Sequence, residues 1–208
     1  MTSATAHWSA ANQERAEVIL ATYPEPRSAI MPLLYIASLE HRSVSDEAMR
    51  EVAALVGITA AQVQSVASFY TMFKREEVGQ YHVSVCTSIS CHLLDGDAVL
   101  DAVTSAADAA DDDGDEFVIS TERAECIGAC GGAPAIQVNY ETVEGLTPET
   151  ATALVEWLAG SRPEVVLADE MQQLFGGQRS FDWGPSDSQG AIAAVPAYQP
   201  FGSAREGR

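Results

Sequence analysis

The four cysteines of this 208-residue chain fall into two short pairs, Cys86 with Cys91 and Cys126 with Cys130. Small residues, mostly serine, threonine, glycine and alanine, fill the sequence around both pairs. A 2Fe–2S cluster requires four thiolates, and small neighbours let backbone N–H groups approach its anionic bridging sulfides. The pattern therefore predicts one 2Fe–2S cluster bound by these four residues, and a role in electron transfer.

Other uses of four cysteines are weaker but not all excluded. Structural zinc sites favour cysteine pairs two to four residues apart, so the spacings here are tolerable for zinc, and a zinc-stabilised structural protein remains open. A dithiol oxidoreductase would need Cys-x-x-Cys at a helix start, which this sequence lacks. His92 follows a cysteine directly, but Rieske-type ligation uses two histidines and the other loop has none.

The segment from residue 79 to 160 is expected to position these loops. Tyr81, Val83 and Val85 alternate with polar residues, which predicts a half-buried strand leading into Cys86. Further strands are predicted at 117–120 and 135–138, with helices at 93–110 and from Pro148, capped by Thr147. This order predicts a small α/β domain with both cysteine loops at one edge of its sheet.

Residues 1–78 read as a helical domain. Ser45 is a predicted cap of one helix, which Gly57 ends, and Thr59 with Gln62 forms a capping-box signal for the next. A group of large apolar residues near the end of this domain is interpreted as core, with a partner-docking surface as the alternative; it comprises Phe69, Tyr70, Met72 and Phe73.

Beyond Gly160 the sequence loses its periodicity. Glycine and proline recur through residues 161–208, together with the aromatic residues Phe175, Phe181, Trp183, Tyr198 and Phe201. Such a segment predicts no independent fold, yet it is more aromatic than a plain linker. It is expected to be an extended tail lying across a partner.

The charge excludes several classes of partner. Thirty acidic residues against 11 basic ones give a formal net charge of −19, which repels phosphate backbones, so no nucleic-acid role is expected. No apolar run is long enough to span a bilayer, and the N-terminus shows neither signal-peptide nor transit-peptide character. A cytoplasmic protein without direct membrane insertion is expected.

Several motifs resemble one known family. Four stretches of the sequence are similar to the thioredoxin-like 2Fe–2S subunit of bacterial respiratory complex I (NADH:quinone oxidoreductase). They are residues 57–73, the motif Cys86-Thr-x-x-x-Cys91, residues 125–134 and Leu146-Thr-Pro-Glu149. The resemblance covers about residues 28 to 159. It departs at Gly131-Gly132, where an apolar residue and an asparagine are usual, and at Ser90, where another small residue or proline is more usual.

The resemblance implies an α+β chain, with an N-terminal helical bundle followed by a thioredoxin-like domain. It also implies that Cys86, Cys91, Cys126 and Cys130 are the cluster ligands. The chain would be a subunit of NADH:quinone oxidoreductase, with no complete active site of its own and no NADH or FMN bound to it.

In that family the cluster exchanges single electrons with the FMN of a partner flavoprotein subunit, which also binds NADH. The partners implied are this flavoprotein and other peripheral-arm subunits, on the cytoplasmic side of the membrane. Equivalent subunits occur in NAD-linked formate dehydrogenases and hydrogenases, which remain the alternative host complexes.

The sequence also predicts a low reduction potential for the cluster. Neither cysteine loop contains lysine or arginine, and Arg123 is the nearest basic residue. Because cluster potential depends on net charge around the site, an acidic chain disfavours the added electron.

Overall fold

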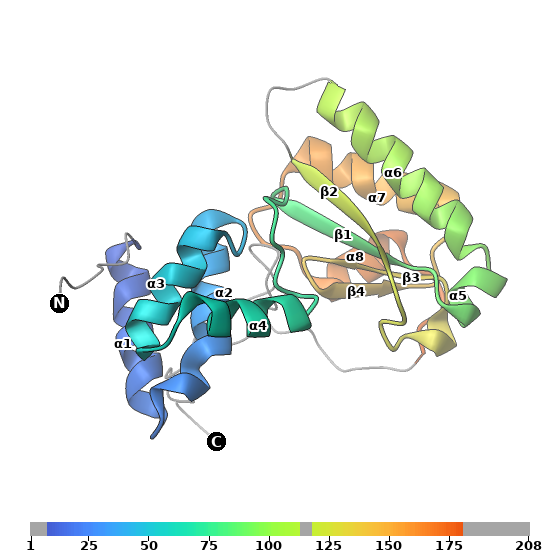
Figure 1. Ribbon diagram of the computed structural model, residues 1–208. Coiled ribbons are helices and arrows are strands. Elements are labelled where there is room, and N and C mark those ends of the chain that lie inside the picture. The colour runs from blue at the N-terminus through green and yellow to red at the C-terminus, as the bar shows by residue number, and fades with distance from the viewer. Residues whose placement is uncertain (1–7, 113–117, 181–208) are drawn as a thin grey trace, which may run out of the picture. The chain divides into compact units, whose positions relative to one another are not determined.

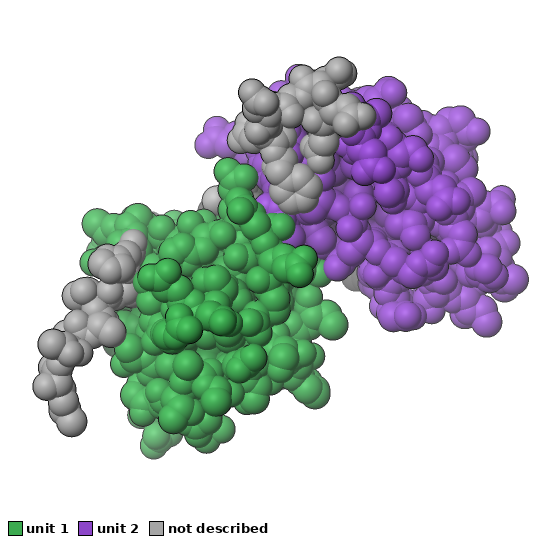
Figure 2. Space-filling model, turned by 45° about the horizontal axis from the view of Figure 1, so that its top comes forward, with its two compact units in different colours: residues 1–77, 198–208 green, residues 78–197 purple. Residues whose placement is uncertain are grey.

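The computed structural model describes residues 8–112 and 118–180. Its described residues form two compact units, one ending at Glu77 and one beginning at Val78, which Figure 2 colours separately. The first unit is helical and the second combines helices with a sheet, so the predicted α+β class is confirmed.

The helical unit contains α1 (Ala10–Thr22), a 3₁₀ turn (Pro26–Ala29), α2 (Ile30–His41), α3 (Asp46–Val56) and α4 (Ala60–Phe69) (Figure 1). The predicted caps are confirmed: the Ser45 hydroxyl accepts the Ala48 N–H at 3.1 Å, and Thr59 and Gln62 form a complete capping box. Within the described residues no single helix is long and apolar enough to cross a bilayer. One bent pair, α3 with α4 at 117°, meets that test by length and composition alone.

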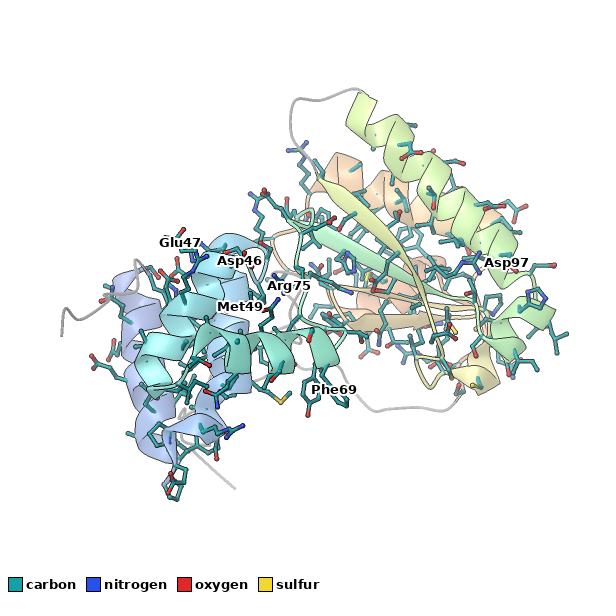
Figure 3. All side chains as sticks on the ribbon, in the orientation of Figure 1. Asp46, Glu47, Met49, Phe69, Arg75 and Asp97 are labelled. Carbon is teal, nitrogen blue, oxygen red and sulfur yellow. The ribbon has the colours of Figure 1, made fainter. Side chains whose placement is uncertain are left out.

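The aromatic end of this unit contributes mainly to its core. Phe73 is buried, and Tyr70 and Met72 pack against the same cluster. Phe69, at the C-terminal end of α4 (Figure 3), differs from the other three because 77% of its surface is exposed. The interpretation as core is therefore confirmed for three of the four residues.

The second unit is built on a four-stranded sheet. Its elements are β1 (Tyr81–Cys86), α5 (Ile89–Leu93), α6 (Gly96–Asp112), β2 (Ile119–Ala124), a 3₁₀ turn (Cys130–Gly132), β3 (Ala135–Val138), β4 (Glu141–Glu144), α7 (Pro148–Ser161) and α8 (Ala168–Phe175). The strand order is β2-β1-β3-β4, with β1 parallel to β2 and the other pairs antiparallel. Parallel β1 and β2 bring their carboxyl ends, and the cysteine loops that follow, to one edge.

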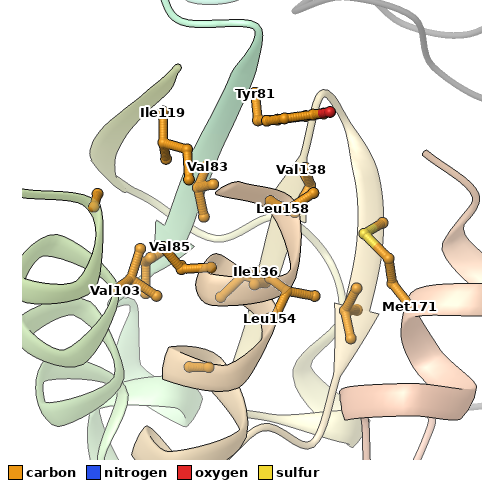
Figure 4. Packing of buried hydrophobic residues seen from close by; sticks show 14 of the residues in the cluster. Tyr81, Val83, Val85, Val103, Ile119, Ile136, Val138, Leu154, Leu158 and Met171 are labelled. Carbon is orange, nitrogen blue, oxygen red and sulfur yellow. The ribbon is translucent and has the colours of Figure 1, made fainter. Parts of the chain in front are cut away.

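The core of this unit lies between the sheet and its helices. Val83 and Val85 of β1 and Ile136 of β3 pack with Val103 of α6 and Leu154 of α7 (Figure 4). All of these side chains are fully buried. The alternating apolar residues of β1 therefore supply one face of the core, as the sequence predicts. The strand is not half-buried as expected, however, because His82 and Ser84 on its other face are buried too.

Several elements differ from the prediction. The helix expected at 93–110 is divided into α5 and α6 by Asp95, whose φ of 65° lies in the left-handed region. Strand β4 was not predicted, because Val143 is its only apolar residue and because its turn uses Asn139 and Tyr140, both with positive φ. Tyrosine is rarely found in that conformation and gives no turn signal.

The segment after Gly160 also differs from the extended tail that the sequence predicts, as far as residue 180. Helix α8 packs on the sheet unit: Val166 and Met171 are fully buried, and the Trp157 and Phe175 rings lie 5.6 Å apart. These few anchors carry too weak a periodicity to outweigh the surrounding glycines and prolines. Phe181, Trp183, Tyr198 and Phe201 lie outside the described residues, so the partner-bound tail stays a prediction for residues 181–208.

Replacing Met171 with alanine is expected to destabilise the sheet unit by about 2 kcal/mol, the low end for a buried methionine, because α8 is short. Urea unfolding followed by far-UV circular dichroism measures this. Leu174→Ala, on the same helix but 55% exposed, is the matched control and should change stability by less than about 0.5 kcal/mol. Equal, small effects of both variants would show that α8 does not pack as described.

Candidate metal centre

The first cysteine pair is buried. Cys86 is the last residue of β1 and Cys91 lies in α5, and their exposed fractions are 3% and 2%. The loop between them is tied to the neighbouring strand, because the Thr87 N–H donates to the Ala124 carbonyl at 3.1 Å. The pKa of the Cys91 thiol is raised to about 12, mainly by burial and secondly by the hydrogen bond with the Cys86 thiol.

The second pair lies at the surface of the same unit. Cys126 and Cys130 are exposed, and their Sγ atoms are 3.4 Å apart. Gly128, with a φ of 91°, makes the tight turn that brings them together, a conformation other residues rarely adopt. The hydrogen bond with Cys126 and the charge on its thiolate raise the pKa of Cys130.

The two loops are in contact with each other. Ser90, from the first loop, hydrogen-bonds with the Cys130 thiol of the second, and Cys86 and Cys130 also interact electrostatically. The charge of Cys130 likewise helps to raise the pKa of the Cys91 thiol. The structure thus brings all four predicted residues to one edge of the sheet, where the neighbouring thiols help to raise the pKa of Cys91 and of Cys130.

This donor set fits a metal centre, because bound cations relieve the repulsion between crowded thiolates. Across the described residues, no three or more His, Cys, Asp or Glu side chains are grouped as ligands of a single ion. The thiols are instead arranged as two pairs. Four thiols in two pairs fit a 2Fe–2S cluster, which takes four thiolates and no other ligand from the protein.

Two residues that support the first loop were not singled out from the sequence. A side chain at Gly96 would lie 2.7 Å from the Cys91 carbonyl oxygen and 3.0 Å from that of Cys86, so only glycine allows α6 to begin here. Asp97 (Figure 3) bonds to His92 Nδ1 at 2.6 Å and to Arg123 Nη1 at 2.8 Å. These hydrogen bonds lower the pKa of Asp97 and connect α5, α6 and β2.

Support for the second loop comes from residues distant in sequence. Gly132 packs against the buried Glu144 at the end of β4, and a side chain at position 132 would also lie 2.7 Å from the Gln178 carbonyl oxygen. The glycine that departs from the usual family residue is therefore required by this packing. No sequence signal identifies it, since the contacts join residues 12 and 46 positions apart.

Several proteins are similar to this chain. A subunit of the Mycobacterium tuberculosis NADH-quinone oxidoreductase is 37% identical over 150 residues, which cover 72% of this chain and 60% of that protein. A subunit of the Rhizobium meliloti NADH-quinone oxidoreductase is 36% identical over 69% of this chain and 86% of its own length. Subunit 2 of the Thermus thermophilus NADH-quinone oxidoreductase is 36% identical over 74% of this chain and 88% of its own length.

The fold has a counterpart among solved structures. The crystal structure of an air-oxidised NAD⁺-reducing [NiFe]-hydrogenase superposes with a TM-score of 0.54 at 18% identity, over 70% of this chain and 25% of that one. Residues 16–159 match the thioredoxin-like [2Fe-2S] ferredoxin family. The thioredoxin-like fold implied by the family resemblance is thus confirmed, and the chain belongs to the thioredoxin-like [2Fe-2S] ferredoxin family.

Proposed function

We propose that this chain is the electron-transfer subunit of the NADH dehydrogenase module of an NADH:quinone oxidoreductase. The observation that carries the proposal is the pairing of Cys86 with Cys91 and of Cys126 with Cys130 at one sheet edge. Membership of a 2Fe–2S family and relatives named as subunits of that oxidoreductase support it. The chain would work on the cytoplasmic side of the membrane, together with other peripheral-arm subunits.

In this proposal the four cysteines hold one 2Fe–2S cluster, which when bound accepts and releases one electron at a time. Cys86 and Cys91 exclude water from one side of the site, because both are buried. Cys126 and Cys130 leave the other side accessible from the surface of this unit. The FMN and NADH sites are expected on a partner flavoprotein subunit.

The surface beside the first loop suits a protein partner. Ile89 and Leu93 of α5 are 74% and 75% exposed, and the adjoining Leu94 is 54% exposed. Grouped apolar side chains on an otherwise acidic protein are costly to leave in water, and such patches commonly mark interaction sites. We propose that this patch, residues 89, 93 and 94, contacts the flavoprotein subunit.

Leu93→Asp is expected to weaken binding of the flavoprotein subunit by about tenfold or more, because it places a charge in an apolar interface. Co-purification with the flavoprotein subunit, with iron measured in the same sample, tests this. Leu174→Asp, which adds the same charge to an exposed position on α8, should co-purify normally. Undiminished co-purification of the Leu93 variant would reject docking at this patch.

The first experiment on the proposed function is anaerobic absorption and EPR spectroscopy of the purified protein, before and after dithionite, with iron and zinc assays. About two irons per chain and a rhombic S = 1/2 signal on reduction are expected. A colourless, EPR-silent protein with stoichiometric zinc would reject electron transfer in favour of a structural role.

The second candidate is the equivalent subunit of an NAD-linked hydrogenase or formate dehydrogenase. The superposition on an NAD⁺-reducing hydrogenase favours it at the level of fold alone. Purification of the complex from its native cells decides between the hosts. A co-purifying hydrogenase or formate dehydrogenase subunit would support the second candidate, and quinone-reducing activity with NADH would support the first.

A further inference from the structure

The second cysteine loop is backed by a buried carboxylate. Glu144, at the end of β4, is only 2% exposed, and its Oε2 accepts the backbone N–H of Ser180 at 2.6 Å. Hydrogen bonds of this kind, from a backbone N–H to a carboxylate, are charge-assisted and short. A negative charge is therefore held inside the unit that contains the cysteines.

The position of this carboxylate is fixed by α8 and by the chain that follows it. Gln172 Oε1 accepts the Glu144 N–H at 2.8 Å, and Gln172 Nε2 donates to the Glu144 carbonyl at 3.0 Å. The Gly177 N–H donates to the same carbonyl at 2.9 Å. Glu144 thus has backbone and side-chain bonds to residues 172–180, and its side chain has little freedom to move away.

The carboxylate is in direct contact with the cysteine loop. Gly132 has no space for a Cβ atom because Glu144 Oε2 occupies it, and the Gly132 carbonyl accepts the Gly145 N–H at 2.6 Å. Gly132 belongs to the same 3₁₀ turn as Cys130. No other residue type at position 132 would let the charge approach this turn so closely.

We propose that Glu144 lowers the reduction potential of the cluster held by the four cysteines; this inference rests on the proposed function. Reduction adds a negative charge to the site, and a carboxylate fixed nearby opposes that addition. Each exposed acidic residue contributes less than a buried one, because salt and water screen exposed charges more strongly than buried charges. Glu144 acts as a positioning residue as well, since it holds the turn that contains Cys130.

The test compares two variants that each remove one negative charge from β4. Glu144→Gln preserves the shape of the side chain and is expected to favour reduction about tenfold, equivalent to an upward shift of 59 mV for one electron. Glu141→Gln is the matched control: this residue lies at the other end of β4, paired with Val138, where its carboxylate accepts the Ala168 N–H. Glu141→Gln should change the equilibrium constant for reduction of the cluster by less than about twofold.

Midpoint potentials are measured by EPR-monitored redox titration of the full chain, with iron counted in each sample. A Glu144→Gln protein with full iron and an unshifted potential overturns the inference and leaves the proposed function intact. Equal shifts in both variants also overturn it, because they would reflect net charge alone. A wild-type protein without iron would instead overturn the proposed function.

If Glu144→Gln does not hold the cluster, Glu144→Asp tests whether the carboxylate acts on the cluster or serves the fold alone. This variant keeps the charge and shortens the side chain by one methylene group. The inference requires that Glu144→Asp restore both the iron content and a potential close to that of the wild type. A colourless Glu144→Asp protein overturns it, because the residue would then serve the fold alone.

Discussion

Replacing Cys86 with serine is expected to abolish the cluster, lowering iron from about two per chain to almost none. Serine retains the size of the side chain but offers a hard oxygen where Fe–S clusters select soft thiolates. Because Cys86 is buried, water cannot replace it as a ligand without disturbing the end of β1. Iron analysis and the visible absorption of the purified protein measure the loss.

The matched control for this prediction lies in the same loop. Ser88 precedes α5 but makes no capping hydrogen bond through its side chain, so Ser88→Ala should retain both irons. A Cys86→Ser protein that keeps a full complement of iron would show that Cys86 is not a ligand. Loss of iron from both variants would show only that the loop tolerates no change.

Replacing Leu154 with alanine is expected to cost about 3 kcal/mol of unfolding free energy in the sheet unit. Leu154 lies fully buried between α7 and the sheet (Figure 4), where the surrounding side chains are held by several elements and cannot collapse into the space. The removed methyl groups therefore leave a cavity. Urea unfolding, followed by far-UV circular dichroism on cluster-loaded protein, gives the change.

The control for Leu154 is Glu156→Ala, at an exposed position on the same helix. Alanine raises or preserves helix propensity at both positions, so the comparison isolates the loss of buried volume. Glu156→Ala should alter stability by less than about 0.5 kcal/mol. A Leu154→Ala variant as stable as this control would show that the core in Figure 4 is wrongly placed.

Local signals predicted much of the fold. Ser45, Thr59 and Thr147 cap helices where the sequence places them, and β3 has the predicted bounds, because these features depend on a few neighbouring residues. Strand β2 continues to Ala124 instead of ending at Ser120, and its predicted first residue, Phe117, lies outside the described residues. Its polar second half is held by pairing with β1, a contact that local sequence does not report.

The same distinction applies to the candidate site. The spacing of the cysteines and their place after strands predicted that the two loops would meet. The contact between Ser90 and Cys130, and the support of Gly132 by Glu144, depend on tertiary packing and could not be predicted. Gly131-Gly132 was visible only as a departure from a family pattern, and its physical reason required the position of residues 176–180.

The packing of Glu144 and residues 172–180 against the second cysteine loop has a consequence for biosynthesis. Cys126 and Cys130 leave the ribosome well before residues 172–180, on which the position of Glu144 and of the adjoining turn depends. A nascent chain that exposes all four thiols therefore still lacks the support for one of its two pairs. The proposed cluster site can therefore be completed only after α8 has been synthesised, and a chain truncated before that helix carries the thiols without the residues that support the second pair.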